Sequence, residues 1–89
     1  MSNLSNNNWV PCEDGKNLPE MTLVYASEYQ SQKVLIQTRR GEMFIATCVV
    51  NKYNHAIKWV SCGTGGRQMR VMSKVVAWME LPEPYKESD

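Results

Sequence analysis

The sequence predicts a mainly β protein: a single small antiparallel sheet of about five strands, or a partly open barrel, with at most a short helix. Three observations support this fold class. Short segments rich in β-branched and aromatic residues recur along the chain, and turn residues separate them. Two of these separating turns are too short for a crossover, so the strands that flank them should be antiparallel. The 89 residues are the size of one small domain, whose thin core depends on its few large aromatic side chains.

The composition of the two ends sets the expected domain boundaries. Residues 1–8 are polar and rich in Asn, without periodicity, so we expect a disordered N-terminal tail. Residues 9–84 should form the single β domain. Residues 85–89 follow a Pro-rich stretch and should form a mobile C-terminal tail.

The domain opens with WVPCEDGKNLPE, residues 9–20, which should be an ordered loop. Its prolines fix φ and remove backbone donors, while its Gly and Asn tolerate turn conformations. Neither a regular helix nor a long strand fits this composition. Trp9 and Leu18 would hold the loop in place if their side chains are buried.

Two strands should follow the opening loop, over residues 21–27 and 33–39, because both segments are rich in β-forming residues. The polar residues between them, 28–32, are interpreted as a turn. Arg40 and Gly41 then predict a tight turn, in which Gly41 adopts a positive φ at low cost. The strands on either side of this turn should be antiparallel neighbours.

The third strand, residues 42–50, has two largely apolar faces, which is typical of a central strand covered on both sides. Residues 51–55 should form a hairpin loop before a fourth strand at residues 56–62. That strand carries Trp59, which we expect in the core because few other residues can supply as much buried area. A glycine-rich loop at residues 63–68 comes next.

The segment from residue 69 to Leu81 allows two interpretations. Its β-branched content and its end at Pro82 favour a strand over residues 75–80, whereas residues 69–75 could form a short helix. Trp78 lies within this strand, and we expect it in the core together with Trp59.

The three cysteines, Cys12, Cys48 and Cys62, are widely spaced and odd in number. This pattern does not fit a disulfide scaffold, and Cys48 and Cys62 are interpreted as small buried hydrophobic residues. A zinc site that uses the cysteines and His55 is the alternative. Structural zinc sites usually use closely spaced ligand pairs, which this chain lacks, so we expect neither a metal nor another cofactor.

Charge is distributed unevenly although the net charge is only +1. Residues 33–74 contain eight Lys or Arg side chains and one acidic side chain, whereas both flanking segments are acidic. The acidic ends could fold back over the basic middle and neutralise it. Alternatively, the middle could present a positive face to phosphates or to an acidic protein.

Five residues in this middle region are predicted to bind a partner: Arg39, Arg40, Tyr53, Arg67 and Arg70. Arg67 and Arg70 lie in GTGGRQMR, whose guanidinium groups could pair with phosphate or carboxylate oxygens. The segment lacks the Gly-Lys-Ser/Thr ending of a P-loop, and a solvent-facing loop is the alternative interpretation. Tyr53, beside Lys52, is an aromatic residue expected to be exposed.

The sequence does not predict an enzyme. The single histidine, His55, falls in an expected hairpin loop. Glu13 and Asp14 should raise the pKa of the neighbouring Cys12 thiol, which disfavours a reactive thiolate. No feature of the sequence places a pair of carboxylates in one pocket, so the requirements of an active site are not met together.

Both ends of the expected domain carry a Trp followed by Leu-Pro-Glu, which we interpret as two clamps at the ends of one domain. The residues of these motifs and of the first strand are Trp9, Val10, Asp14, Leu18, Pro19, Glu20, Leu23, Val24, Tyr25, Val75, Trp78, Leu81, Pro82, Glu83 and Pro84. Over residues 9–85 the chain resembles domain-of-unknown-function family 551, which is found mostly in phages and prophages. Val76, Ala77 and Tyr85 depart from the family pattern.

The resemblance implies a phage or prophage accessory protein in the cytoplasm of a bacterial host. The start of the chain has no secretory signal, and the longest mostly apolar run, residues 43–50, is too short to span a membrane. The leading hypothesis is stoichiometric binding of a host or defence protein, as an inhibitor or modulator. The alternative is binding of nucleic acid or a phosphorylated nucleotide through the basic middle. Because so thin a core can leave an apolar face uncovered, a homodimer is a further hypothesis.

Overall fold

The computed structural model describes residues 8–12, 15–63 and 67–82. These residues form eight strands and no α-helix. The strands are β1 (Val10–Pro11), β2 (Met21–Val24), β3 (Glu28–Ser31), β4 (Val34–Thr38), β5 (Met43–Asn51), β6 (Ile57–Cys62), β7 (Gln68–Arg70) and β8 (Val75–Glu80). The two expected tails lie outside the described residues, apart from Asn8, which is exposed.

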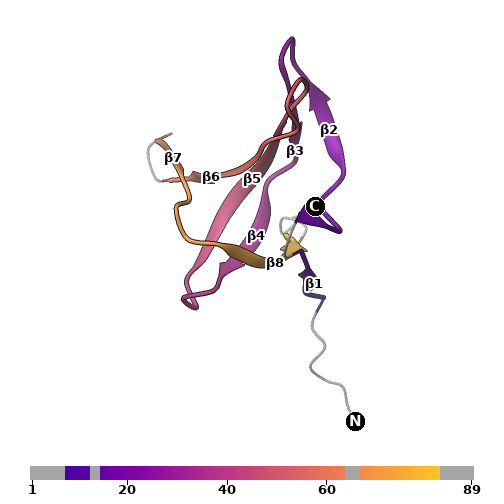
Figure 1. The fold of residues 1–89 in the computed structure, drawn as a ribbon. Helices are drawn as coiled ribbons and strands as arrows, with labels where there is room; N and C mark the ends of the chain where they lie inside the picture. The colour runs from indigo at the N-terminus through magenta and orange to yellow at the C-terminus, as the bar shows by residue number, and fades with distance from the viewer. Residues whose placement is uncertain (1–7, 13–14, 64–66, 83–89) are drawn as a thin grey trace, which may run out of the picture.

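All eight strands belong to one antiparallel sheet that is curled into a half-barrel (Figure 1). The order is β1-β8-β4-β5-β3-β2, and β6 pairs with both β5 and β7. The long strand β5 is central, because β3 and β4 pair along one side of it and β6 along the other. The predicted mainly β antiparallel fold is confirmed, with more strands than the five expected.

Two of the additional strands correct the sequence interpretation. Residues 28–32, predicted as a polar turn, instead contain β3, in which Tyr29 pairs with Val50 and Gln30 with Val49. Residues 69–75 do not form a helix, because Met69 and Arg70 belong to β7 and pair with β6. Both segments are polar or mixed in sequence, and they become strands because an existing strand offers them backbone partners.

β3 and β4 follow one another along the same side of β5, and a bulge separates them. Four steps along the chain, from Gln30 to Val34, oppose only three steps along β5, from Val49 to Ala46. Ser31 lies inside this bulge and is fully buried. Its Oγ accepts a 2.9 Å hydrogen bond from the backbone N–H of Cys48. The hydroxyl thus replaces the backbone carbonyl that would accept this bond in a regular strand pair.

The core lies on the concave face of the sheet. Its buried side chains are Cys12, Val34, Ile36, Ala46, Cys48, Trp59 and Val75. The pairing of Cys48 with Trp59 places these two side chains on the same face. Trp59 is 8% exposed, which confirms its predicted place in the core. Cys62, predicted to be buried, is half-buried on the opposite face of β6.

Only part of β5 is covered on both faces, contrary to the prediction for the whole strand. Residues 46–49 are buried on both faces, whereas Met43, Phe44 and Ile45 are exposed. The reason is that β6 pairs with β5 only between Ala46 and Val50, so the first third of β5 extends past it.

The two Trp/Leu-Pro segments meet in space instead of closing opposite ends of the domain. Val10 of β1 pairs with Trp78 of β8, and the Nε1–H of Trp78 donates a 2.7 Å hydrogen bond to the carbonyl of Asn17. Asn17 has a φ of 57°, a left-handed conformation that Asn tolerates. Trp78 is therefore half-buried at the edge of the core, where it secures the opening loop to β8.

Candidate functional site

The predicted partner-binding residues do not form one site. Arg39 and Arg40 lie in the β4–β5 turn, which Gly41 closes with a φ of 88° and a 2.9 Å hydrogen bond to Thr38. Tyr53 lies in the β5–β6 turn, at the other end of β5. A nine-residue strand is roughly 25–30 Å long, so Tyr53 is too far from the two arginines to share a small ligand with them.

The other two arginines belong to the β6–β7 hairpin. Arg70 pairs with Val60, and the carbonyl of Arg67 accepts a 2.7 Å hydrogen bond from the Gly63 N–H. Arg67 also lines a shallow pocket of about 190 Å³ together with Lys33, a cation from the junction of β3 and β4. The structure therefore gives Arg67 a neighbour that the sequence did not indicate.

Tyr53 shares one end of the sheet with two other tyrosines, because two hairpin ends are joined there. The ends of the β2–β3 and β5–β6 hairpins lie together, opposite the β4–β5 turn (Figure 1). The backbone N–H of Lys52 in one end donates a 2.9 Å hydrogen bond to the carbonyl of Ser27 in the other. Tyr25, Tyr29 and Tyr53 are 48%, 40% and 78% exposed at this joined end. We call these three residues the aromatic tip.

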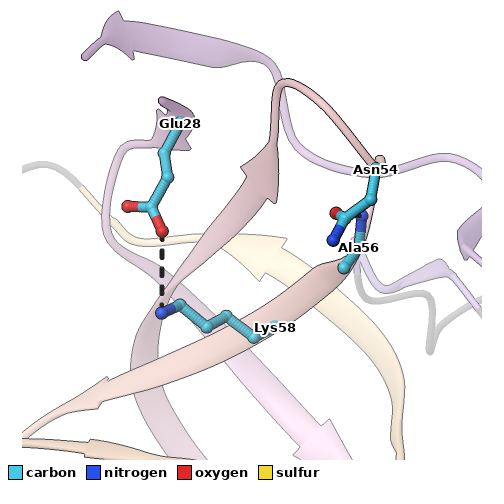
Figure 2. Close-up of polar contacts among 4 residues, drawn as sticks. All are labelled: Glu28, Asn54, Ala56 and Lys58. Atoms are coloured by element: carbon cyan, nitrogen blue, oxygen red, sulfur yellow. Dashed lines mark hydrogen bonds and ion pairs between the residues drawn. The ribbon is translucent and has the colours of Figure 1, made fainter. Parts of the chain in front are cut away.

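The turn that carries Tyr53 is held in one conformation by local hydrogen bonds. The side-chain oxygen of Asn51 accepts hydrogen bonds from the N–H groups of Tyr53 and Asn54, at 2.8 and 3.0 Å. The side-chain oxygen of Asn54 accepts a third from the Ala56 N–H, at 2.9 Å (Figure 2). His55 between them has a φ of 61°. These Asx-type contacts fix the turn before any partner arrives.

Two lysines contribute positive charge beside the aromatic tip. The Nζ atom of Lys52 lies 5.1 Å from the centre of the Tyr29 ring, a cation–π contact. The Nζ atom of Lys58 lies 3.7 Å from a carboxylate oxygen of Glu28, across β5 (Figure 2). Both lysine contacts are on the surface, so they orient side chains more than they stabilise the fold. The tip thus combines exposed rings with one lysine on a ring face and one ion pair.

Tyr53 was indicated by the sequence, whereas Tyr25 and Tyr29 were not recognised as lying at the same end of the sheet. The cause was the interpretation of residues 28–32 as a turn, which hid the pairing of Tyr29 with Val50. The signal that was available is YASEY, in which two tyrosines flank a short polar turn between β-forming residues. Tyr25 N–H donates to the carbonyl of Glu28 at 2.8 Å and closes this hairpin.

Three further observations concern the groups that could catalyse a reaction or bind a metal. Burial, together with the nearby Cys12, raises the pKa of the Cys48 thiol to about 12, so it stays protonated at neutral pH. His55 is exposed in its turn. Among the residues that the structure describes, no three His, Cys, Asp or Glu side chains gather where they could hold a metal ion.

A pocket of about 280 Å³ lies beside Trp78, where the two Trp/Leu-Pro segments meet. Glu20, Lys33 and Glu80 contribute charged groups to its wall. The pocket is open and mainly polar in lining, unlike the enclosed apolar cavities that usually hold small molecules. The aromatic tip is therefore the stronger binding surface.

The fold and the site together define a class: a small all-β half-barrel that presents tyrosines on the joined ends of two hairpins. No protein-family model, curated protein or solved structure matches this chain. Within the described ranges, no helix has the length and apolar character needed to cross a membrane. Function is therefore inferred from the geometry of the chain itself.

Proposed function

We propose that this chain is a phage- or prophage-encoded accessory protein that binds one host or defence protein stoichiometrically and inhibits or modulates it. The observation that carries the proposal is the aromatic tip, three exposed tyrosines on two hairpin ends that a backbone hydrogen bond joins. The phage or prophage setting rests on the resemblance of the end motifs.

The physical chemistry of tyrosine favours a protein partner for this surface. Tyrosine provides a large contact area, loses little conformational entropy on binding, and is enriched among the residues that dominate interface energies. The local hydrogen bonds of the Asn51 side chain fix the turn that carries Tyr53, which lowers the cost of ordering it on binding. Lys52 beside the tip favours a partner with an acidic group at this position, whereas the charge of Lys58 is balanced by Glu28.

Truncation of two tip tyrosines tests the proposal. The immobilised wild-type chain should retain one protein from a bacterial host lysate at near-equal molar ratio. The purified partner should bind the double variant Tyr25→Ala, Tyr53→Ala about 30-fold more weakly in calorimetry, because each truncation removes a ring typical of an energetic hot spot. Met72→Ala removes a side chain that is 85% exposed and lies outside the tip, so it should bind as the wild type does.

The proposal fails if the double variant keeps wild-type affinity for the partner. It also fails if Met72→Ala weakens binding as much as the double variant does. Both variants alter exposed side chains, so circular dichroism and the unfolding midpoint should match those of the wild type.

The basic pocket of Lys33 and Arg67 supports a second function, the binding of nucleic acid or a phosphorylated nucleotide. Its specific support is the convergence of two cations from separate parts of the chain on one pocket, with Gln68 as an additional hydrogen-bonding group. Arg70 lies on the same hairpin, three residues beyond Arg67. Such an arrangement can contact phosphate oxygens without reading base sequence.

Salt dependence distinguishes this second function from the first. If it operates, fluorescence anisotropy with generic DNA or RNA should show affinity that falls steeply with salt, because cation–phosphate contacts release counterions. The variant Lys33→Ala, Arg67→Ala should then have a shallower salt slope, by about 0.7–0.9 for each phosphate that is no longer neutralised. Arg39→Ala, at the distant β4–β5 turn, should leave the slope unchanged. Binding that is insensitive to salt would eliminate this function.

A further inference from the structure

Strand β2 is an open edge of the sheet. It ends the strand order and, among the described strands, pairs only with β3. Tyr25 directs its N–H to the carbonyl of Glu28, at 2.8 Å. Because backbone groups alternate in direction along a strand, the N–H and C=O of the preceding residue, Val24, point away from β3. Val24 is therefore placed to accept another strand.

The side chains of β2 are those of an interior strand although the strand lies at an edge. Leu23 is 45% exposed and Val24 is 65% exposed, and their side chains point to opposite faces of the sheet. Residues 21–27 contain no charged side chain and no proline. Edge strands are normally protected by such residues, because an unprotected edge pairs readily with another chain. The β2–β3 pairing shifts register between Met21 and Leu23 and is regular from Leu23 to Val24.

We propose that β2 pairs with β2 of a second copy of this chain, antiparallel and about a two-fold axis, to form a homodimer with a continuous sheet. In a two-fold pairing, each residue of β2 in one copy lies opposite a residue of β2 in the other copy. The uncharged composition of residues 21–27 means that no like charges meet across the axis. Leu23 and Val24 would each gain cover, one on either face of the sheet.

The other terminal strands of the sheet are less suited to self-pairing. β7 carries Arg70 and follows directly after Arg67, so two copies of this edge would bring cations together. β1 is two residues long and includes Pro11, which has no N–H to donate. Charge and backbone chemistry thus select β2 as the strand for a second copy.

The antiparallel arrangement has a consequence for the aromatic tip. Tyr25 follows Val24 directly, so the two Tyr25 residues would flank the two-fold axis, while the hairpin turns that follow them would run in opposite directions. The dimer would therefore present two aromatic tips in opposite directions. The pairing itself does not depend on the proposed function, whereas a ratio of two partners per dimer rests on it.

Sedimentation equilibrium with charge-swap variants tests the proposal. The average mass of the wild-type chain should rise from that of one chain toward that of two as the concentration increases. Val24→Lys and Val24→Glu should each weaken self-association by about tenfold or more, because each variant places like charges near the two-fold axis. An equal mixture of the two variants should recover association. Met72→Lys adds a charge at an exposed site away from β2 and should leave association unchanged.

Hydrogen exchange of the wild-type Val24 amide provides a measurement that needs no variant. Exchange at this amide should slow as the concentration rises through the dissociation constant, because the second copy supplies its acceptor. A single-chain mass at all concentrations would overturn the proposal. So would a dimer in which the Val24 amide stays unprotected, or a Lys/Glu mixture that associates no better than either variant alone.

Discussion

Replacement of Trp59 by Ala is expected to lower the free energy of unfolding by about 3–5 kcal/mol. Trp59 is 8% exposed and is the cross-strand partner of Cys48 in the core of the half-barrel. The loss combines the transfer free energy of the indole with the cost of the cavity that it leaves. Small domains are stable by roughly 5–15 kcal/mol in total, so this change removes a large part of the stability.

Urea unfolding followed by circular dichroism measures this loss. Tyr53→Ala is the matched control, since it also truncates an aromatic side chain but at a site that is 78% exposed. The control should unfold within about 0.5 kcal/mol of the wild type. A Trp59→Ala variant as stable as this control would show that the half-barrel does not depend on its indole.

Ser31→Ala is expected to cost about 1–3 kcal/mol although it removes a single oxygen atom. The hydroxyl of Ser31 accepts a hydrogen bond from the Cys48 N–H at 2.9 Å and donates one to the Gln32 carbonyl at 2.8 Å. Both Ser31 and Cys48 are fully buried. Without the hydroxyl, the buried N–H of Cys48 has no acceptor, because water does not reach it. The folded state then bears the full cost of removing this N–H group from water.

Two measurements separate this effect from a general loss of packing. The free energy of unfolding should fall, and hydrogen exchange at the Cys48 amide should accelerate more than at other core amides of β5. Ser27→Ala removes a hydroxyl from an exposed turn and should change neither quantity. Unchanged exchange at Cys48 in the Ser31 variant would mean that another group accepts its hydrogen bond.

These two predictions concern a part of the molecule that is separate from the aromatic tip. Trp59 and Ser31 act where the sheet curves and closes on its core, whereas Tyr53 projects from a turn beyond it. Changes at the tip should therefore alter binding with little loss of stability. The core supplies a rigid base, and the hairpin ends supply the contact surface.

Features that depend on neighbours in the sequence were predictable. The turn at Arg40 and Gly41 formed as expected, because a connection of a few residues between two β-rich segments allows only an antiparallel hairpin. The β5–β6 hairpin follows from the same local reasoning, and the core position of Trp59 from the scarcity of other large apolar side chains. The place of Tyr53 beside Lys52 in an expected hairpin loop also indicated that it would be exposed, and it is 78% exposed.

Features that depend on distant pairing were not predictable in the same way. β3 is polar, and its strand conformation arises from the backbone partners that β5 offers it. The pairing of Val10 with Trp78 joins residues from the two ends of the domain, and neither segment alone indicates it. Nothing in the sequence indicated the buried role of Ser31, because a bulge depends on how two strands pair.

Local sequence was sufficient for the fold class, the tight hairpins and the chemical character of each surface residue, because propensities and short connections act over a few positions. Which of those residues share a surface became clear only from the folded sheet. The sheet brings Tyr53, Tyr25 and Tyr29 to one end, places Lys33 and Arg67 in the lining of one pocket, and separates Arg39 and Arg40 from them all. The reason is that the curl and register of the sheet come from pairing between segments far apart in the chain.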